Sequence, residues 1–260
     1  MRKIMLFAFL LGTLGLTACK GLREPTDTFV EDIAETSAEN KFSESISFQI
    51  NASSPEYKAT LIYTDEGMCS AETLVISRKE SGADIQTISL PPNECFAPDP
   101  VYALDVTFDG NCDLLVPREH PASAVWFLCF VWDEETETFI YAPGFDSLSN
   151  FSLDYENQLI LDNRTASMIT SYGMSVYDEE AKDFVWQKSL YWEPVLEDES
   201  LETYKFQESK HENGKDITVV EEIVPGKLLM VDKTHPTVAP YFEDGSLWDL
   251  DSEKWNFTLY

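Results

Sequence analysis

The sequence predicts an all-β protein built from antiparallel hairpins. From Ser45 onward, apolar and polar residues alternate over short runs, as they do in strands with one buried face. Turn-forming residues such as Gly82, Asn213-Gly214 and Pro225-Gly226 separate these runs. The period of a long amphipathic helix is absent from the same region. These three observations together favour an all-β fold.

The strand candidates follow one another with short gaps. Pro91-Pro92 and Pro98–Pro100 break the chain before Val101, and Ala124–Asp133 is apolar almost throughout, which predicts a central strand. In chain order the predicted strands are Ser45–Asn51, Tyr57–Tyr63, Thr73–Arg78, Asp84–Leu90, Val101–Val106, Asp113–Val116, Ala124–Asp133, Thr138–Tyr141, Gln158–Leu161, Ser167–Met174, Phe184–Trp192, Glu202–Ser209, Asp216–Ile223 and Leu228–Asp232.

A weak internal repeat bears on how these strands are arranged. Trp132–Tyr141 is similar to Tyr177–Trp186 at an offset of 45 residues, and Trp248–Trp255 is a looser third copy. An offset of this size is typical of propeller blades. The alternative interpretation is that all three are hairpins with solvated acidic turns. The sequence therefore predicts a propeller-like fold or a stack of antiparallel β-hairpins.

The first residues have the pattern of an export signal. Arg2 and Lys3 precede the apolar run Ile4–Leu16, which is shorter than the ~20 residues that span a bilayer. Leu16-Thr17-Ala18-Cys19 resembles the lipobox of bacterial lipoproteins. That resemblance implies that Cys19 carries diacylglycerol and becomes the mature N-terminus. An ordinary secretory peptide with an incidental cysteine is the alternative.

This pattern divides the chain into three parts. Residues 1–18 are the predicted lipoprotein signal peptide, residues 19–44 a flexible polar tether, and residues 45–260 a single all-β domain. A short helix around Thr28–Ala38 is compatible with the tether sequence. Because two or more acyl chains anchor a protein stably, we expect the mature protein at the cell envelope, lipid-anchored and extracytoplasmic.

The charge balance limits the partners. There are 47 acidic residues against 18 Lys and Arg, a formal net charge of −29, and loss of Arg2 and Lys3 with the signal brings it to about −31. Such a surface repels nucleic acid and anionic lipid and attracts cations and basic proteins. A hydrophobic content of 43% is enough for a packed core.

Four cysteines remain after Cys19, an even number that suggests disulfides in an exported chain. Four cysteines allow three pairings. Cys69 and Cys95 flank the turn at Gly82 symmetrically, and Cys112 and Cys129 flank His120-Pro121 almost symmetrically, so we predict bridges 69–95 and 112–129. Reduced, buried thiols are the alternative.

A calcium loop is predicted at residues 105–113. Oxygen-bearing side chains recur at Asp105, Thr107, Asp109 and Asp113, Asn111 would offer its carbonyl, and Gly110 permits a sharp turn. Val116 stands where an EF-hand has its bidentate glutamate, and an apolar strand follows instead of a helix. The expected cofactor is therefore Ca²⁺ bound between β-strands. An acidic turn without an ion is the alternative.

This loop and its trailing strand resemble FG-GAP or VCBS-type calcium repeats. The order of segments around it is similar to a group of bacterial envelope proteins with a propeller-like fold and a bound calcium, one branch of which comprises periplasmic lipoproteins that block lysozyme-like effectors from rival cells. The resemblance covers about Asp84–Trp192, and Thr107 stands where Asn or Asp is usual. Its segments are Asp84–Ile88, Asp105–Leu115, Trp126–Trp132, Leu148–Asn150, Leu159–Ile160 and the hairpin that ends near Trp186.

No catalytic residue is predicted. His120, His211 and His235 lie apart near Pro, Gly or charged residues, which is not a zinc-ligand pattern, and no nucleophile elbow, P-loop or dinucleotide motif is present. We therefore expect a binding protein rather than an enzyme, with a protein partner such as a basic secreted cell-wall hydrolase that it inhibits, as an immunity protein does. The alternatives are a carbohydrate or cell-wall binding lipoprotein, a glycosidase that uses two facing carboxylates, and a structural envelope protein with no discrete ligand.

Overall fold

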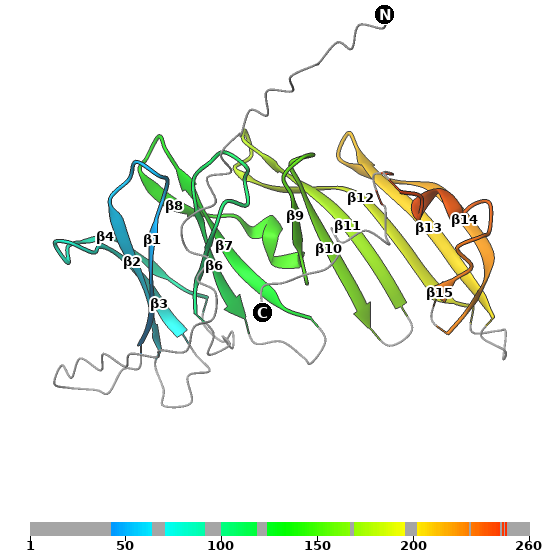
Figure 1. Ribbon diagram of the computed structural model, residues 1–260, viewed down its shortest axis with the longest axis horizontal. Helices are drawn as coiled ribbons and strands as arrows, with labels where there is room; N and C mark the ends of the chain where they lie inside the picture. Colours follow the sequence, from blue (N-terminus) through cyan, green and yellow to red (C-terminus); the bar gives the residue numbers. More distant parts are fainter. Residues whose placement is uncertain are drawn as a thin grey trace, which may run out of the picture.

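The protein is all-β, as predicted. The computed structural model describes residues 43–63, 71–91, 100–118, 124–166, 169–195, 202–228, 230–244, 246 and 248. In this part of the chain all strand pairs are antiparallel, and the helical segments are two short 3₁₀ turns (Figure 1). No helix of the described chain is long and apolar enough to cross a membrane.

The strands form three meandering sheets, two of four strands and one of seven. The first contains β1 (Ser43–Gln49), β2 (Glu56–Tyr63), β3 (Ala71–Arg78) and β4 (Asp84–Ser89). The second contains β5 (Tyr102–Leu104), β6 (Asp113–Arg118), β7 (Trp126–Asp133) and β8 (Thr138–Tyr141). The third contains β9 (Ser152–Asp154), β10 (Leu159–Ala166), β11 (Ile169–Asp178), β12 (Asp183–Pro194), β13 (Thr203–Glu212), β14 (Lys215–Lys227) and β15 (Met230–Val231). The 3₁₀ turns are η1 (Pro143–Ser147) and η2 (Ala239–Tyr241).

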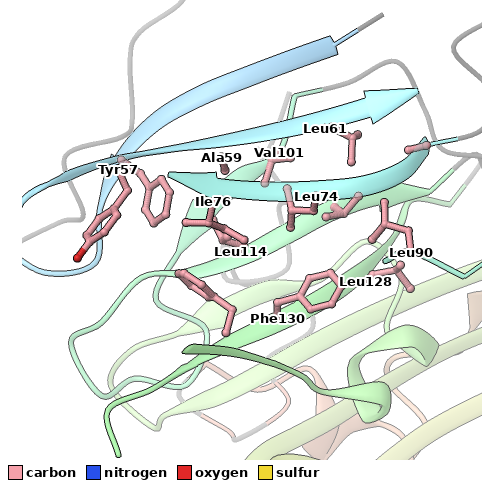
Figure 2. Packing of buried hydrophobic residues seen from close by; sticks show 14 of the residues in the cluster. Tyr57, Ala59, Leu61, Leu74, Ile76, Leu90, Val101, Leu114, Leu128 and Phe130 are labelled. Atoms are coloured by element: carbon pink, nitrogen blue, oxygen red, sulfur yellow. The ribbon is translucent and has the colours of Figure 1, made fainter. Parts of the chain in front are cut away.

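Three hydrophobic cores hold these sheets in a stack. The first lies between the first two sheets, where Leu61 and Leu74 meet Leu114 and Leu128 (Figure 2). The second lies on the other face of β6 and β7, where Leu115 and Phe127 pack with Phe145 of η1 and with the third sheet. Because β6 and β7 are covered on both faces, they read as continuous apolar runs, and the expected central strand at 124–133 is confirmed.

The third core covers the other face of the seven-stranded sheet. Trp192, Tyr204 and Phe206 pack there against Val231, Val238 and other residues of the C-terminal segment. Gly144 of η1 permits a close backbone approach in the second core, since an added Cβ would lie 2.1 Å from the carbonyl oxygen of Phe184. The structure is therefore a stack of antiparallel hairpin sheets with separate cores, the second of the two arrangements predicted from the sequence.

The 45-residue repeat marks a turn motif. β7–β8 and β11–β12 are hairpins with four-residue connections, since Asp133 pairs with Thr138 and Asp178 pairs with Asp183. In each turn the aspartate side chain accepts a backbone hydrogen bond, and the last connecting residue, Glu137 or Lys182, has a positive φ of 54° or 51°. The two hairpins belong to different sheets, so the repeat unit is one hairpin rather than a whole blade.

A third turn of the same kind joins β9 to β10. Asp154 pairs with Leu159, accepts hydrogen bonds from the backbone of Glu156 and Asn157, and precedes Gln158, whose φ is 54°. Sequence analysis did not find this hairpin because β9 has three residues. The proposed third copy, Trp248–Trp255, lies outside the described residues except for Trp248.

Several other predictions meet the structure directly. The Asn213-Gly214 hairpin is confirmed, with positive φ values of 52° and 72° between the paired residues Glu212 and Lys215. The predicted strand Gln158–Leu161 is part of β10, which continues through residues 162–166. The signal peptide, almost all of the tether, Cys19, the 69–95 bridge and His120 lie outside the described residues.

The predicted 112–129 disulfide is wrong. Cys129 is a free, buried thiol. It faces the second core, whereas Cys112 faces the first, on the other side of the second sheet. The true register pairs Leu115 with Cys129 and Leu114 with Phe130, so the turn is not centred on His120-Pro121. An odd shift in register moves a side chain to the opposite face of a sheet. Cys112 itself is disulfide-bonded, with its partner outside the described residues.

Candidate metal loop and acidic end

The predicted calcium loop connects β5 to β6 at one end of the second sheet. Its turn is made by Phe108 at φ 65° and Gly110 at φ 90°. The N–H of Cys112 donates to the carbonyl of Ile50, 2.6 Å away, which ties the loop to the first sheet. All five predicted ligands therefore lie in one compact bend.

Asp113 holds this bend together from within. Its side chain is fully buried; Oδ2 accepts from the N–H of Val106 at 3.0 Å, and Oδ1 accepts from the N–H of Trp132 at 2.9 Å. Thr107 also donates to Oδ2, through its N–H at 3.3 Å and its Oγ1 at 3.4 Å. Burial raises the pKa of Asp113 well above its ordinary value, against the lowering effect of these backbone donors. Asp113 thus clamps the start of the loop to β7.

Asp105 has the one loop carboxylate oxygen that lacks a partner. Its Oδ2 accepts from the N–H of Gly110 at 3.0 Å, while its Oδ1 is buried without a hydrogen bond. Burial raises the pKa of Asp105, and the negative charge of Asp109 raises that pKa further. A buried acceptor without a donor costs free energy, which a bound cation would offset.

Asn111 links the loop to two neighbouring turns. Its Nδ2 donates to Glu134 Oε1 of the β7–β8 turn at 3.1 Å and to Asp109 Oδ2 at 3.2 Å. Its Oδ1 accepts from Asn51 Nδ2 in the β1–β2 turn at 2.9 Å. The backbone N–H of Asn111 donates to Asp109 Oδ1 at 2.7 Å. The Asn111 side chain therefore has a structural role that the spacing argument did not anticipate.

The ligand types in the loop suit a hard cation, but the side chains are not arranged around a common centre. Three carboxylates, a hydroxyl and a carbonyl are oxygen ligands of the kind that Ca²⁺ prefers. Yet in the described chain no three His, Cys, Asp or Glu side chains gather closely enough to hold a metal ion. Most of the carboxylate oxygens instead accept hydrogen bonds from the loop itself. The unpartnered Asp105 oxygen is the observation that favours an ion.

Three more turns adjoin the loop, and we call the four segments together the acidic end: residues 105–113, 133–137, 154–158 and 178–183. Besides the Asn111–Glu134 hydrogen bond, the ring of Phe108 meets that of Tyr155 edge-on, 5.4 Å between centroids. Lys182 Nζ lies 2.7 Å from Asp133 Oδ1. These contacts join the β5–β6, β7–β8, β9–β10 and β11–β12 connections into one surface.

The acidic end is almost uniformly negative. It has three acidic residues in the loop, four in the β7–β8 turn, two in the β9–β10 turn and four in the β11–β12 segment, against the single base Lys182. Glu135 and Glu179 are exposed. Sequence analysis saw the acids of individual turns as solvated faces. The β7–β8, β9–β10 and β11–β12 turns each have an aspartate followed by four connecting residues. This shared pattern was the sequence feature that could have indicated that the turns lie side by side.

Comparison with known proteins adds little. No protein-family model matches the chain, and no curated protein matches it. Among solved structures, a protein of unknown function from Bacteroides fragilis is similar over 70% of this chain and 94% of its own, with 9% identity and a TM-score of 0.24.

Proposed function

We propose that this protein is a membrane-anchored extracytoplasmic binding protein that captures a basic protein partner at its acidic end. The observation that carries the proposal is the excess of acids in four neighbouring segments, thirteen acidic residues, eight of them exposed, against one lysine. Charge of one sign on one surface attracts a partner of the other sign and raises the association rate. The resemblance of residues 16–19 to a lipobox supports the anchor.

Calcium is a second part of the proposal. Asp105, Asp109 and Asp113, with Thr107 and the Asn111 carbonyl, would hold the ion. When bound, it would reduce the repulsion among the three carboxylates and brace the loop against its neighbouring turns. The buried, unpartnered oxygen of Asp105 supports this assignment. The role of the ion is structural, since the loop offers no group for chemistry on a substrate.

The binding role is tested by reversing charge at the acidic end. We expect Glu135→Lys with Glu179→Lys to weaken capture of a basic protein from envelope extract, and high salt to weaken capture by the unmodified protein. Glu243→Lys with Asp244→Lys is the matched control, because both residues are exposed and lie in the C-terminal segment. Equal capture by both double variants, or none even at low salt, would contradict the proposal.

The finer form of the proposal is inhibition of a cell-wall hydrolase. A basic lysozyme is a suitable probe, because its substrate is anionic and its own surface is cationic. We expect the purified protein to slow the clearing of a wall suspension by this enzyme. The Glu135→Lys and Glu179→Lys double variant should restore the rate of clearing. If the rate of clearing is the same with and without the purified protein, the protein does not inhibit the enzyme, and only the capture part of the proposal remains.

A further inference from the structure

The hairpin between β14 and β15 carries an exposed leucine at its tip. Lys227 pairs with Met230, and Leu228 follows directly after Lys227. Leu228 is 85% exposed and has a φ of 52°. Two-residue hairpin turns favour Asn and Gly at such angles, as Asn213-Gly214 does at the other end of β14. A bulky apolar residue with this φ is strained, and the exposed side chain of Leu228 is not buried against any part of the described chain.

The base of this hairpin is firmly held. Val231 is 2% exposed in the third core, and a Cβ on Gly226 would lie 2.5 Å from the Tyr204 ring. The N–H of Gly226 donates to the carbonyl of Glu202, and that of Asp232 donates to Pro225, both at 2.8 Å. The fold therefore displays Leu228 on a fixed support, with the half-exposed Met230 beside it.

The hairpin tip lies at the end of the molecule where the chain enters the domain. β1 begins at Ser43 and leads to the Asn51 turn, which contacts the acidic end, so Ser43 lies at the opposite end. β14 likewise runs away from the acidic end, over 13 residues or about 40 Å. Figure 1 shows the start of β1 and the β14–β15 connection at the lower end of the sheets.

We propose that the Leu228 tip inserts into the surface of the lipid bilayer to which Cys19 tethers the protein. The inference rests on the proposed lipid anchor. Residues 20–42 separate Cys19 from Ser43, and the flexible tether that the sequence predicts there, a chain of 23 residues, would span on the order of 25 Å. The end that carries Ser43 is therefore held near the bilayer, and the acidic end points away from it.

The composition of the tip fits a bilayer surface. Leu228 and Met230 offer apolar side chains, and the adjacent Lys227 can place its stem along lipid with its ammonium at the headgroups. The acidic end lies at the far side, while Glu202 and Asp232 stand at the hairpin base, so a zwitterionic bilayer is the suitable probe. The alternative is that the tip docks into a hydrophobic pocket of a partner protein, and the experiment below distinguishes the two.

The experiment places an environment-sensitive fluorophore on Leu228→Cys in the full-length protein bound to phosphatidylcholine vesicles. Cys129 is buried, so it is protected from the labelling reagent in the folded protein, and the unmodified protein treated with the same reagent measures any label at the remaining cysteines. Glu135→Cys, labelled at the acidic end, is the matched control. We expect a blue shift and quenching by lipid-borne quencher at 228 and neither effect at 135.

The outcomes separate this inference from the proposed anchor. Vesicle flotation without a blue shift at 228 would overturn the inference and leave the anchor standing. A shift that needs added envelope protein would overturn it too, because the tip would then dock on a partner. A shift at 228 without salt-resistant flotation would support the tip contact and remove the lipid anchor.

A second variant guards against misfolding. Asn tolerates a positive φ better than Leu, so Leu228→Asn should fold with an undiminished melting temperature. On vesicles, acetylation of Lys227 by a water-soluble reagent should rise in this variant, while acetylation of the exposed Lys215 at the far end of β14 should not change. Equal labelling of Lys227 in the variant and the unmodified protein would contradict the contact.

Discussion

Lys182 Nζ lies 2.7 Å from Asp133 Oδ1, and this ion pair joins the two hairpin turns that are similar in sequence. Asp133 belongs to the β7–β8 turn of the second sheet and Lys182 to the β11–β12 turn of the third. Lys182 is also the turn residue with positive φ, and its side chain reaches the neighbouring turn. The pair thus connects two sheets at the acidic end.

Replacing Lys182 by Met should lower the melting temperature slightly, and more near neutral pH than in acid. The hydrogen bond from Lys182 holds the pKa of Asp133 below its ordinary value. A depressed folded-state pKa contributes stability that is present above the unfolded value and is lost as pH falls through the folded value. Lys79→Met, which removes the exposed pair with Glu56, is the control and should have less effect. Identical pH dependence in both variants would contradict this.

Asp162 should make the protein less stable as pH rises from about 4 to about 6. Burial raises the pKa of Asp162 to about 6, partly opposed by Arg164. The folded state then binds a proton that the unfolded state has released, so stability is greatest below the unfolded pKa and declines until the folded pKa is passed. The loss is on the order of 2–3 kcal/mol.

Asp162→Asn is the variant that tests this titration. It keeps a similar shape beside Gly173, whose Cα closely faces the Asp162 carboxyl group. We expect denaturant melts at pH 7 to show a more stable variant, and the difference to vanish near pH 4. A difference that stays constant across this range would assign the effect to packing rather than to charge.

Calcium should stabilise the domain through the loop. A ligand at 100 times its dissociation constant adds about 2.7 kcal/mol to the free energy of unfolding. The melting temperature should therefore fall when a chelator is added. Asp105→Asn should abolish this response, because it neutralises the carboxylate with the unpartnered oxygen. Glu135→Gln makes the same charge change at an exposed site and should keep the response; a chelator-insensitive wild-type protein would reject the ion.

Cys129 should be unreactive in the folded protein. Burial raises the pKa of its thiol well above the ordinary value, so the reactive thiolate is scarce. Thiol reagent should label Cys129 after unfolding without reductant and not before. Peptide mapping under the same conditions should find Cys112 in a disulfide with a cysteine other than Cys129. A recovered 112–129 peptide pair would contradict the register described above.

The positions of most strands follow from local sequence. Alternation and turn residues identified the hairpins on both sides of Asn213-Gly214, and the apolar run 124–133 marked a strand buried on both faces. These features depend on residues close together in the chain. β9 and η1 were missed because three to five residues carry too little periodic signal.

The candidate site was predicted in part. The spacing of Asp105, Asp109 and Asp113 placed three carboxylates in one bend, as the structure has them. It did not reveal that both carboxylate oxygens of Asp113 accept hydrogen bonds from backbone N–H groups. Nor did it reveal that the Asn111 side chain forms hydrogen bonds with Asn51 and Glu134. Such partners come from turns 60 and 23 residues away, and no local pattern encodes them.

The sequence by itself determined the all-β class, the order of the hairpins and the excess of negative charge, because alternation, turn chemistry and composition are properties of neighbouring residues. Tertiary structure decided which faces of the sheets meet, and with that the separation of Cys112 from Cys129. It also gathered the acidic turns at one end and left Leu228 exposed at the other. Register and stacking are set by contacts between distant residues, since a shift of a single residue would exchange the two faces of a strand.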